Sequence, residues 1–121
     1  MSAPDSHRLS ILSKSEIQEL YGMPVFNEAD RWRYFDMSPV EMASAQSRTH
    51  ALGMFQTLEL GYFKAKRQFF TFQVIDVQAD LRHIADRHFW GIDTKELQLP
   101  VAKTRARIQQ NILALCAYQA F

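Results

Sequence analysis

The sequence predicts an all-α fold, a compact bundle of about six helices. Its composition, 47% hydrophobic and 22% charged in a chain of 121 residues, is typical of one globular domain. Apolar residues recur at the helical period in several segments, and serine or asparagine stands before three of these segments, as a helix N-cap would. The run VIDV at 74–77 alternates as a strand would, but a helical stripe uses the same residues, so we expect no strand.

Two regions are expected: a polar, flexible N-terminus at residues 1–9 and a helical domain at residues 10–121. No signal peptide and no apolar stretch of membrane-spanning length is recognised, so we expect no membrane partner and a cytoplasmic protein. The single cysteine, Cys116, lies in an apolar run and is interpreted as a buried structural thiol rather than a nucleophile.

The first three predicted helices are short, and each has a start signal. Ser13 and Glu16 form a capping box, in which each side chain bonds to the backbone of the other residue. Asn27 is the expected N-cap of the second helix and Ser38 that of the third, where proline follows at the first helical position. We expect these helices at residues 13–21, 28–35 and 39–47.

Three longer helices follow. The first has one apolar stripe that includes Phe55 and Tyr62, and its two glycines, Gly53 and Gly61, indicate close packing or a kink. The aromatic segment RQFFTF after this helix is expected to be irregular, and Gly91 is expected to end the next helix. We expect these helices at residues 49–66, 74–89 and 103–118, with a loop at 92–100.

The net charge of +1 is unevenly distributed along the chain. Residues 1–60 hold five Lys and Arg against eight Asp and Glu, a net charge of −3; residues 61–121 hold nine against five, a net charge of +4. The basic excess gathers in two clusters that contain no acid. Such clusters are expected on a surface that binds phosphate, although an ordinary solvated surface gives the same pattern. The clusters are Lys64, Lys66 and Arg67, and Lys103, Arg105 and Arg107.

The two clusters suggest different contacts with nucleic acid. Lys103, Thr104, Arg105 and Arg107 open the last helix, where free backbone N–H groups and the helix dipole favour a phosphate. Basic residues oppose the dipole at this end unless an anion binds, which favours a functional interpretation. In the sequence, aromatic residues flank the other cluster, Lys64, Lys66 and Arg67. They could stack on unpaired bases, but the simpler interpretation places the rings in the core and the cations at its rim.

No catalytic, metal or cofactor site is expected in this 121-residue chain. His83 and His88 are five residues apart, which is not the spacing of two metal ligands on a helix. Asp76, Asp80 and His83 could share a helix face, but no cysteine or further ligand accompanies them. Asp80 is interpreted as a surface charge. No nucleophile with a base, paired carboxylates or glycine-rich phosphate loop can be argued from spacing, so we expect no enzyme activity.

Five segments, taken in order, resemble a known family. They are ILSKSEIQELYGMPVF, RWRYFDMSPVE, LELGYFKAKRQFF, DVQADLRHIADRHF and KTRARIQQNIL. Their order and spacing over residues 8–116 are similar to those of the amino-terminal domain of Tn-three family transposases, a domain formerly of unknown function. None of the five is a catalytic signature, but their order makes the resemblance specific.

The resemblance implies a non-catalytic DNA-binding module of a replicative transposase, which recognises the terminal inverted repeats of a mobile element. In that family a ribonuclease-H-like domain further along the chain cuts and joins DNA with three metal-binding carboxylates. This chain ends before such a domain, as an excised segment or a truncated gene product would. The implied partners are double-stranded DNA at the transposon ends, the remainder of the transposase chain, and a second copy in a homo-oligomer. The implied location is the bacterial nucleoid.

One departure from the family pattern concerns the segment SAQSRTHALG, where family members have several basic residues. Here it has only Arg48 and His50, and we retain Arg48 as a candidate DNA contact. The last helix, or the helix that starts near Thr49, would enter the major groove in a helix-turn-helix-like manner. The alternative is a protein–protein scaffold within the transposase assembly, which predicts weak salt-dependent DNA affinity and a sizeable exposed apolar patch.

Overall fold

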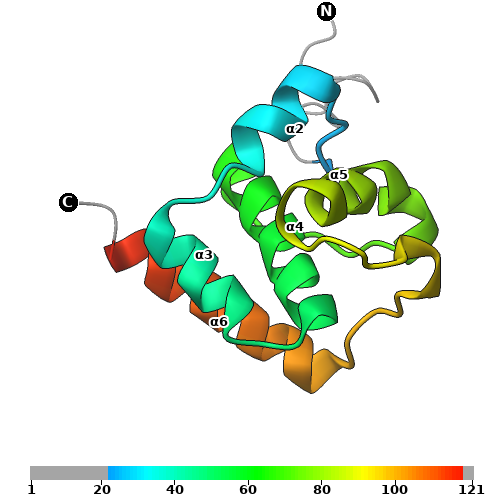
Figure 1. The fold of residues 1–121 in the computed structure, drawn as a ribbon. Helices are drawn as coiled ribbons and strands as arrows, with labels where there is room; N and C mark the ends of the chain where they lie inside the picture. Colours follow the sequence, from blue (N-terminus) through cyan, green and yellow to red (C-terminus); the bar gives the residue numbers. More distant parts are fainter. Residues whose placement is uncertain (1–21, 119–121) are drawn as a thin grey trace, which may run out of the picture.

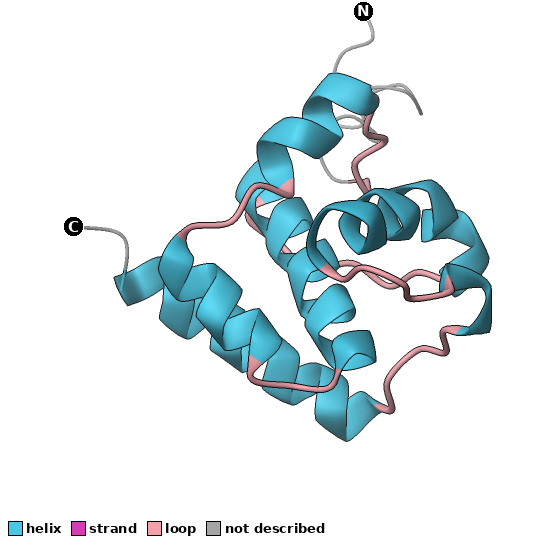
Figure 2. Ribbon diagram, viewed as in Figure 1, coloured by secondary structure: helices cyan, strands magenta, loops and turns pink. Residues whose placement is uncertain are grey.

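The structure is a computed structural model, and it describes residues 22–118. This part of the chain is helical and contains no strand, as Figure 2 shows, so the all-α prediction is confirmed. The predicted helix at 13–21 and the predicted flexible terminus at 1–9 lie outside the described residues. The helices are α2 (Glu28–Tyr34), α3 (Pro39–Gln46), α4 (His50–Lys66), α5 (Gln78–His88) and α6 (Ala102–Tyr118), with the 3-10 helices η2 (Val74–Val77) and η3 (Thr94–Glu96).

Helices α2 and α3 begin at the predicted caps. The side chain of Asn27 accepts a hydrogen bond from the N–H of Asp30 at 2.8 Å, and the Asp30 carboxylate accepts from the N–H of Asn27 at 3.1 Å. Ser38 and Glu41 form the same reciprocal pair at the start of α3. Each capping box satisfies two backbone donors that the helix leaves without a partner, so residues close together in sequence determine both starts.

Helix α4 runs through the centre of the bundle. It contacts α2, α3, α5 and α6, and Figure 1 shows α5 on one side of it and α3 and α6 on the other. Every residue from Gly53 to Tyr62 is buried. Phe55 and Tyr62 of the predicted apolar stripe are buried, as expected. Burial extends beyond that stripe, because α4 is enclosed on all sides over these residues and the polar Gln56 and Glu59 are buried as well.

Two glycines let α4 approach its neighbours closely. A Cβ atom on Gly61 would lie 2.4 Å from the ring of Phe35, and one on Gly53 would lie 2.5 Å from the carbonyl oxygen of Ala45. Phe35 is fully buried, so its ring has little room to move. Close packing, one of the two predicted explanations, therefore accounts for both glycines.

Gly61→Ala is expected to lower the free energy of unfolding by about 1–3 kcal/mol, because the added methyl must displace a buried ring. Urea denaturation followed by circular dichroism measures the change. The loss should be smaller in a Phe35→Leu background, where the shorter side chain leaves room, and a double-mutant cycle isolates this coupling. Equal losses in the two backgrounds would show that the contact does not explain the glycine.

The segment predicted as one helix at 74–89 begins with a turn of 3-10 helix, η2, before α5 starts. Leu81 and Ile84, three residues apart on α5, are fully buried and face the core. Gly91 has a φ of 83°, a left-handed conformation that suits glycine and lets the chain turn away after α5. The expected loop at 92–100 contains the short helix η3.

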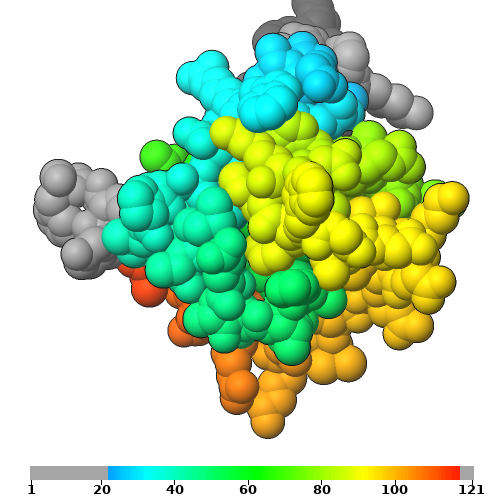
Figure 3. Space-filling model, viewed as in Figure 1, coloured from blue at the N-terminus to red at the C-terminus, as the bar shows by residue number. Residues whose placement is uncertain are grey.

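Helix α6 packs on the bundle through one side only. Ile108, Ile112 and Leu115, which recur at the helical spacing, are buried. Positions on the opposite side are exposed along the length of the helix, and the first turns of α6, orange in Figure 3, project from the lower edge of the molecule. In contrast to α4, this helix presents a long side to solvent.

A buried polar cluster joins α2, α4 and α5. Asp80 on α5 is 7% exposed, and its carboxylate accepts hydrogen bonds from the Tyr62 hydroxyl on α4 and from Nε of Arg31 on α2, the latter at 2.8 Å. Burial raises the pKa of Tyr62, and the negative charge of Asp80 adds to this shift. The interpretation of Asp80 as a surface charge is therefore wrong, because its partners lie on two helices that are distant in sequence.

Candidate nucleic-acid interface

The exposed side of α6 presents a row of polar and small residues, which we call the outward stripe. Lys103, Arg107, Gln110 and Ala114 are all exposed, and their spacing of four, three and four residues places them on one side of the helix. No aspartate or glutamate occurs in α6, so no acid on the helix offsets this charge. Lysine and arginine bond to phosphate, and arginine and glutamine also bond to base edges, so the stripe has the chemistry of a groove-binding helix.

Arg48 lies beside the outward stripe, although it is far away in sequence. Together with Asn111 and Ala114 it lines a groove of about 480 Å³ between the end of α3 and α6. Its Nε donates to the amide oxygen of Gln56 at 3.0 Å, and the amide nitrogen of Gln56 donates to the Ser44 hydroxyl at 2.9 Å. A buried amide thus orients the Arg48 guanidinium, whose terminal nitrogens have no hydrogen-bond partner among the described residues.

Arg105, predicted as a DNA contact, turns toward the bundle. Its Nη2 donates to the carbonyl oxygen of Phe70 at 2.6 Å, and its guanidinium lies over the ring of Phe72, 4.7 Å from the centroid. Its Nε is 3.7 Å from the carboxylate of Glu59, and the side chain is only 17% exposed. Much of its cationic surface is therefore engaged inside the protein. The neighbouring predicted residue, Thr104, is half-buried.

The buried carboxylate of Glu59 explains why Arg105 is held in this way. Glu59 is 2% exposed, and its Oε1 accepts a hydrogen bond from the Gln109 amide at 3.2 Å. Burial raises the pKa of Glu59, and the hydrogen bond from Gln109 and the charge of Arg105 oppose that shift. A buried carboxylate without a cation is costly, so Arg105 and Gln109 anchor the first turns of α6 to α4.

The other predicted cluster, Lys64, Lys66 and Arg67 at the end of α4, does not form one exposed surface. Nζ of Lys64 lies 2.9 Å from the carboxylate of Glu41, which is 4% exposed, and donates to the carbonyl oxygen of Asp36 at 2.9 Å. Lys64 therefore joins α4 to α3 and has its charge balanced within the protein. Lys66 is half-buried, whereas Arg67 is exposed at the end of the helix, where it has a left-handed φ of 59°.

The helix that starts near Thr49, the other predicted DNA reader, is α4. A groove-reading helix must expose one side along several turns, and α4 is buried from Gly53 to Tyr62. Of these two helices, only α6 exposes one side along several turns. Sequence reasoning missed Gln110 and Asn111 as candidate contacts because they are uncharged, although the spacing of Gln110 from Lys103 and Arg107 was a usable signal.

Residues 11–121 match the sequence pattern of a protein family described as a domain of unknown function, DUF4158. The chain belongs to the DUF4158 family. The matched residues include every described helix as well as Arg48 and the outward stripe. No curated protein and no solved structure matches the chain.

Other polar groups of this DUF4158 domain do not assemble into a metal site in the part that the structure describes. Within residues 22–118, no three His, Cys, Asp or Glu side chains are placed so that they could hold a metal ion. Cys116 is half-buried rather than fully buried, and burial raises the pKa of its thiol, which disfavours the reactive thiolate. None of the described helices has the length and apolarity needed to cross a membrane.

Two histidines on α5 have lowered pKa values. Burial lowers the pKa of His88, and the hydrogen bond of its Nε2 with the carbonyl oxygen of Phe35, at 2.8 Å, opposes the shift. Burial also lowers the pKa of His83, and the positive charge of Arg87 adds to this effect. The His83 ring packs against Trp32 and Phe35 near the end of α2, and His88 bonds to the Phe35 backbone, so burial at this contact disfavours the charged form of both rings.

We expect the free energy of unfolding to fall as pH is lowered below the ordinary histidine value of 6.5. A histidine with a lowered pKa in the folded state binds its proton more readily when unfolded, so acid favours the unfolded chain. Urea titrations between pH 5 and 7.5 measure the slope. His88→Gln, which keeps a donor for Phe35, should give a flatter profile than the parent, with His50→Gln at an exposed position as the control. Glu59, whose pKa burial raises, acts in the opposite direction, so the comparison with the variant decides. A His88→Gln profile as steep as that of the parent would contradict the expectation.

Proposed function

We propose that this domain is a non-catalytic module that binds double-stranded DNA through α6. The observation that supports this most strongly is the outward stripe, which combines Lys103, Arg107 and Gln110 on one exposed side of a helix that has no acidic residue. Phosphate contacts from cations supply most of the affinity of such a surface, and contacts to base edges supply its specificity.

In this proposal α6 lies in the major groove. The N-terminal turns of a recognition helix contact base edges, which places Arg107 and Gln110 against the bases, where arginine prefers guanine and glutamine prefers adenine. Ala114, with its small side chain, lets the helix approach the groove closely. Arg48, which Gln56 orients beside α6, contacts a backbone phosphate at one wall of the groove.

The resemblance to the amino-terminal domain of Tn-three family transposases suggests which DNA is bound. We propose that the target is the terminal inverted repeat of a mobile element, and that strand cutting and joining belong to another part of a transposase chain. The remainder of that chain, and a second copy of this domain on the opposite transposon end, are the proposed protein partners.

Fluorescence anisotropy of the 121-residue chain tests the proposal. One labelled duplex has the sequence of the terminal repeat of its own element, and the other has the same bases in scrambled order. We expect tighter binding to the repeat, and an affinity that falls with salt with a slope of about 0.9 per phosphate contacted. Equal and weak binding to both duplexes, with little salt dependence, would contradict the proposal.

A protein–protein scaffold is the second candidate, and exposed apolar side chains favour it. Val25 and Trp90 are each 87% exposed, and Ile75 is 80% exposed. Exposed rings and aliphatic side chains of this kind mark contact surfaces when they are contiguous. The two functions are distinguished by Trp90→Ser, which should leave DNA affinity unchanged if α6 is the reader and should disrupt assembly with the rest of the transposase if the domain is a scaffold.

A further inference from the structure

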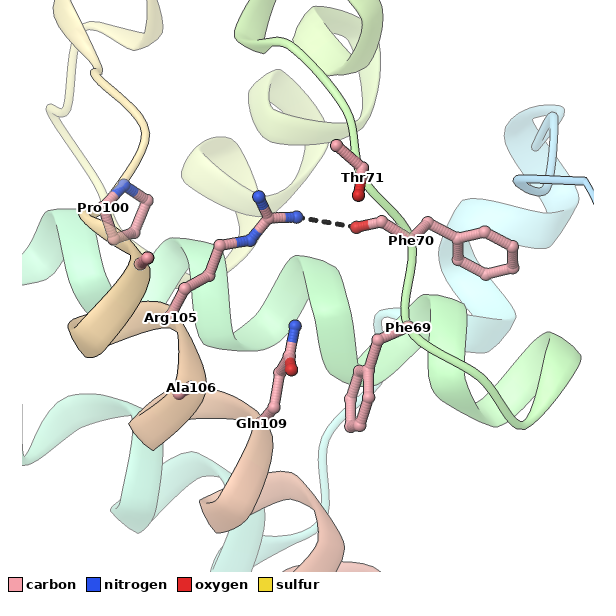
Figure 4. Close-up of a pocket in the computed structure, with 8 residues that line it drawn as sticks. Phe69, Phe70, Thr71, Pro100, Arg105, Ala106 and Gln109 are labelled. Carbon is pink, nitrogen blue, oxygen red and sulfur yellow. Dashed lines mark hydrogen bonds between the residues drawn. The ribbon is translucent and has the colours of Figure 1, made fainter.

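A second feature of the DNA-facing side is a hollow next to the outward stripe. It has a volume of about 350 Å³ and lies where the loop after α4 meets the start of α6. Figure 4 shows Phe69 and Pro100 on opposite sides of it, with Arg105 and Gln109 between them. The residues that matter for its chemistry are Phe69, Thr71, Pro100, Arg105, Ala106 and Gln109.

The hollow combines polar groups with apolar surface, and Phe69, Pro100 and Ala106 supply apolar parts of its lining. The ring of Phe63 stacks on one face of Phe69, with ring centroids 5.0 Å apart and an angle of 25° between the planes. This contact fixes the orientation of Phe69, and it leaves the edge and the other face of the ring for the hollow. Pro100 and the methyl group of Ala106 complete a slot of apolar surface. A planar group that enters the slot could stack on Phe69.

The polar groups of the hollow offer both donors and acceptors. The hydrogen bond of Arg105 to Phe70 uses Nη2, and Nη1 has no partner among the residues that the structure describes. The Gln109 amide nitrogen donates to Glu59, so its carbonyl oxygen is left for a ligand. The hydroxyl of Thr71, an exposed residue on the wall, can donate or accept.

This combination of a flat ring with an amide and a guanidinium points to a nucleobase rather than to a phosphate. A phosphate could bond to Arg105 and Thr71 but would leave the acceptor of Gln109 and the ring of Phe69 unused, whereas a base can stack on the ring and bond to both donors and acceptors. We propose that the hollow binds one unpaired nucleobase of the DNA held on α6. The inference rests on the proposed function, because Ala106 and Gln109 precede Arg107 and Gln110 of the outward stripe by one residue each.

The test compares a blunt terminal-repeat duplex with duplexes that have a three-nucleotide single-stranded extension on either strand at either end. The wild-type chain should bind at least one extended duplex about tenfold more tightly than the blunt one, as expected for one stacked base. Ala106→Trp fills the hollow from an exposed helix position and should remove this gain. Ala29→Trp, an exposed alanine on α2, is the matched control and should keep it.

Phe69→Leu gives a second route to the same result, because it removes the stacking ring without touching α6. It should reduce the gain from the extension and leave the affinity for the blunt duplex within about twofold. If the wild-type chain binds the blunt duplex but gains nothing from any extension, the base-binding inference is wrong while the proposed function stands. If neither kind of duplex binds, the proposed function is contradicted and the inference with it.

Discussion

Replacing Lys103 and Arg107 together with alanine is expected to weaken binding to the terminal-repeat duplex by about 10- to 100-fold. Both side chains are exposed on the outward stripe, so the change removes two charged contacts without opening the core. The slope of log affinity against log salt should fall by about 0.9, because Lys103 contacts phosphate and Arg107 contacts bases in this proposal. The free energy of unfolding should stay within about 0.5 kcal/mol of the parent value.

Loss of positive charge anywhere on the domain weakens DNA binding slightly, so the control must remove the same charge elsewhere. Arg82→Ala combined with Lys95→Ala removes two exposed cations outside α6, one on α5 and one on η3. We expect this variant to bind the duplex nearly as well as the parent does. Equal weakening by the two double variants would mean that net charge, and not the outward stripe, determines the affinity.

Arg105→Ala is expected to act on stability instead, with a loss of about 2–4 kcal/mol in the free energy of unfolding. The change removes the hydrogen bond to the Phe70 carbonyl oxygen and the contact with the Phe72 ring. It also leaves the carboxylate of Glu59, which is 2% exposed, without its cation. Chemical denaturation at pH 7 measures the loss.

Arg107→Ala is the matched comparison for this variant, because it removes the same side chain from an exposed position two residues away on α6. The two variants should therefore change different properties. Arg105→Ala should lower the free energy of unfolding, and Arg107→Ala should weaken DNA binding. Arg105→Ala with native stability and a large loss of affinity for the blunt duplex would show that the arginine contacts the duplex itself, as the sequence alone suggests.

Much of the helical layout follows from residues that are neighbours in sequence. Asn27 and Ser38 begin their helices through contacts three residues away, and Gly91 allows the turn after α5. Such signals are visible in the sequence because their partners lie within one turn. The burial of α4 on all sides from Gly53 to Tyr62 could not be predicted in this way, because Gln56 and Glu59 are typical of an exposed side and bond to Ser44 on α3 and Gln109 on α6.

The candidate site was only partly predictable for the same reason. The charge distribution identified Lys103 and Arg107, which remain on the surface, but it gave equal weight to Lys64 and Arg105. Lys64 pairs with Glu41 and Arg105 lies beside Glu59, and both carboxylates are far away in the chain. A linear sequence does not reveal such pairs. The position of Arg48 beside α6 likewise depends on how α3 and α6 pack against α4.

Nuclear magnetic resonance of the ¹⁵N-labelled chain, titrated with the terminal-repeat duplex, tests whether α6 is the helix that reads DNA. We expect the largest amide shifts at residues 102–114 of α6 and around Arg48, with small shifts along α5. Shifts that centre on Arg67 or Trp90, or no shifts at a duplex concentration that saturates anisotropy, would contradict the account and assign DNA binding to another surface.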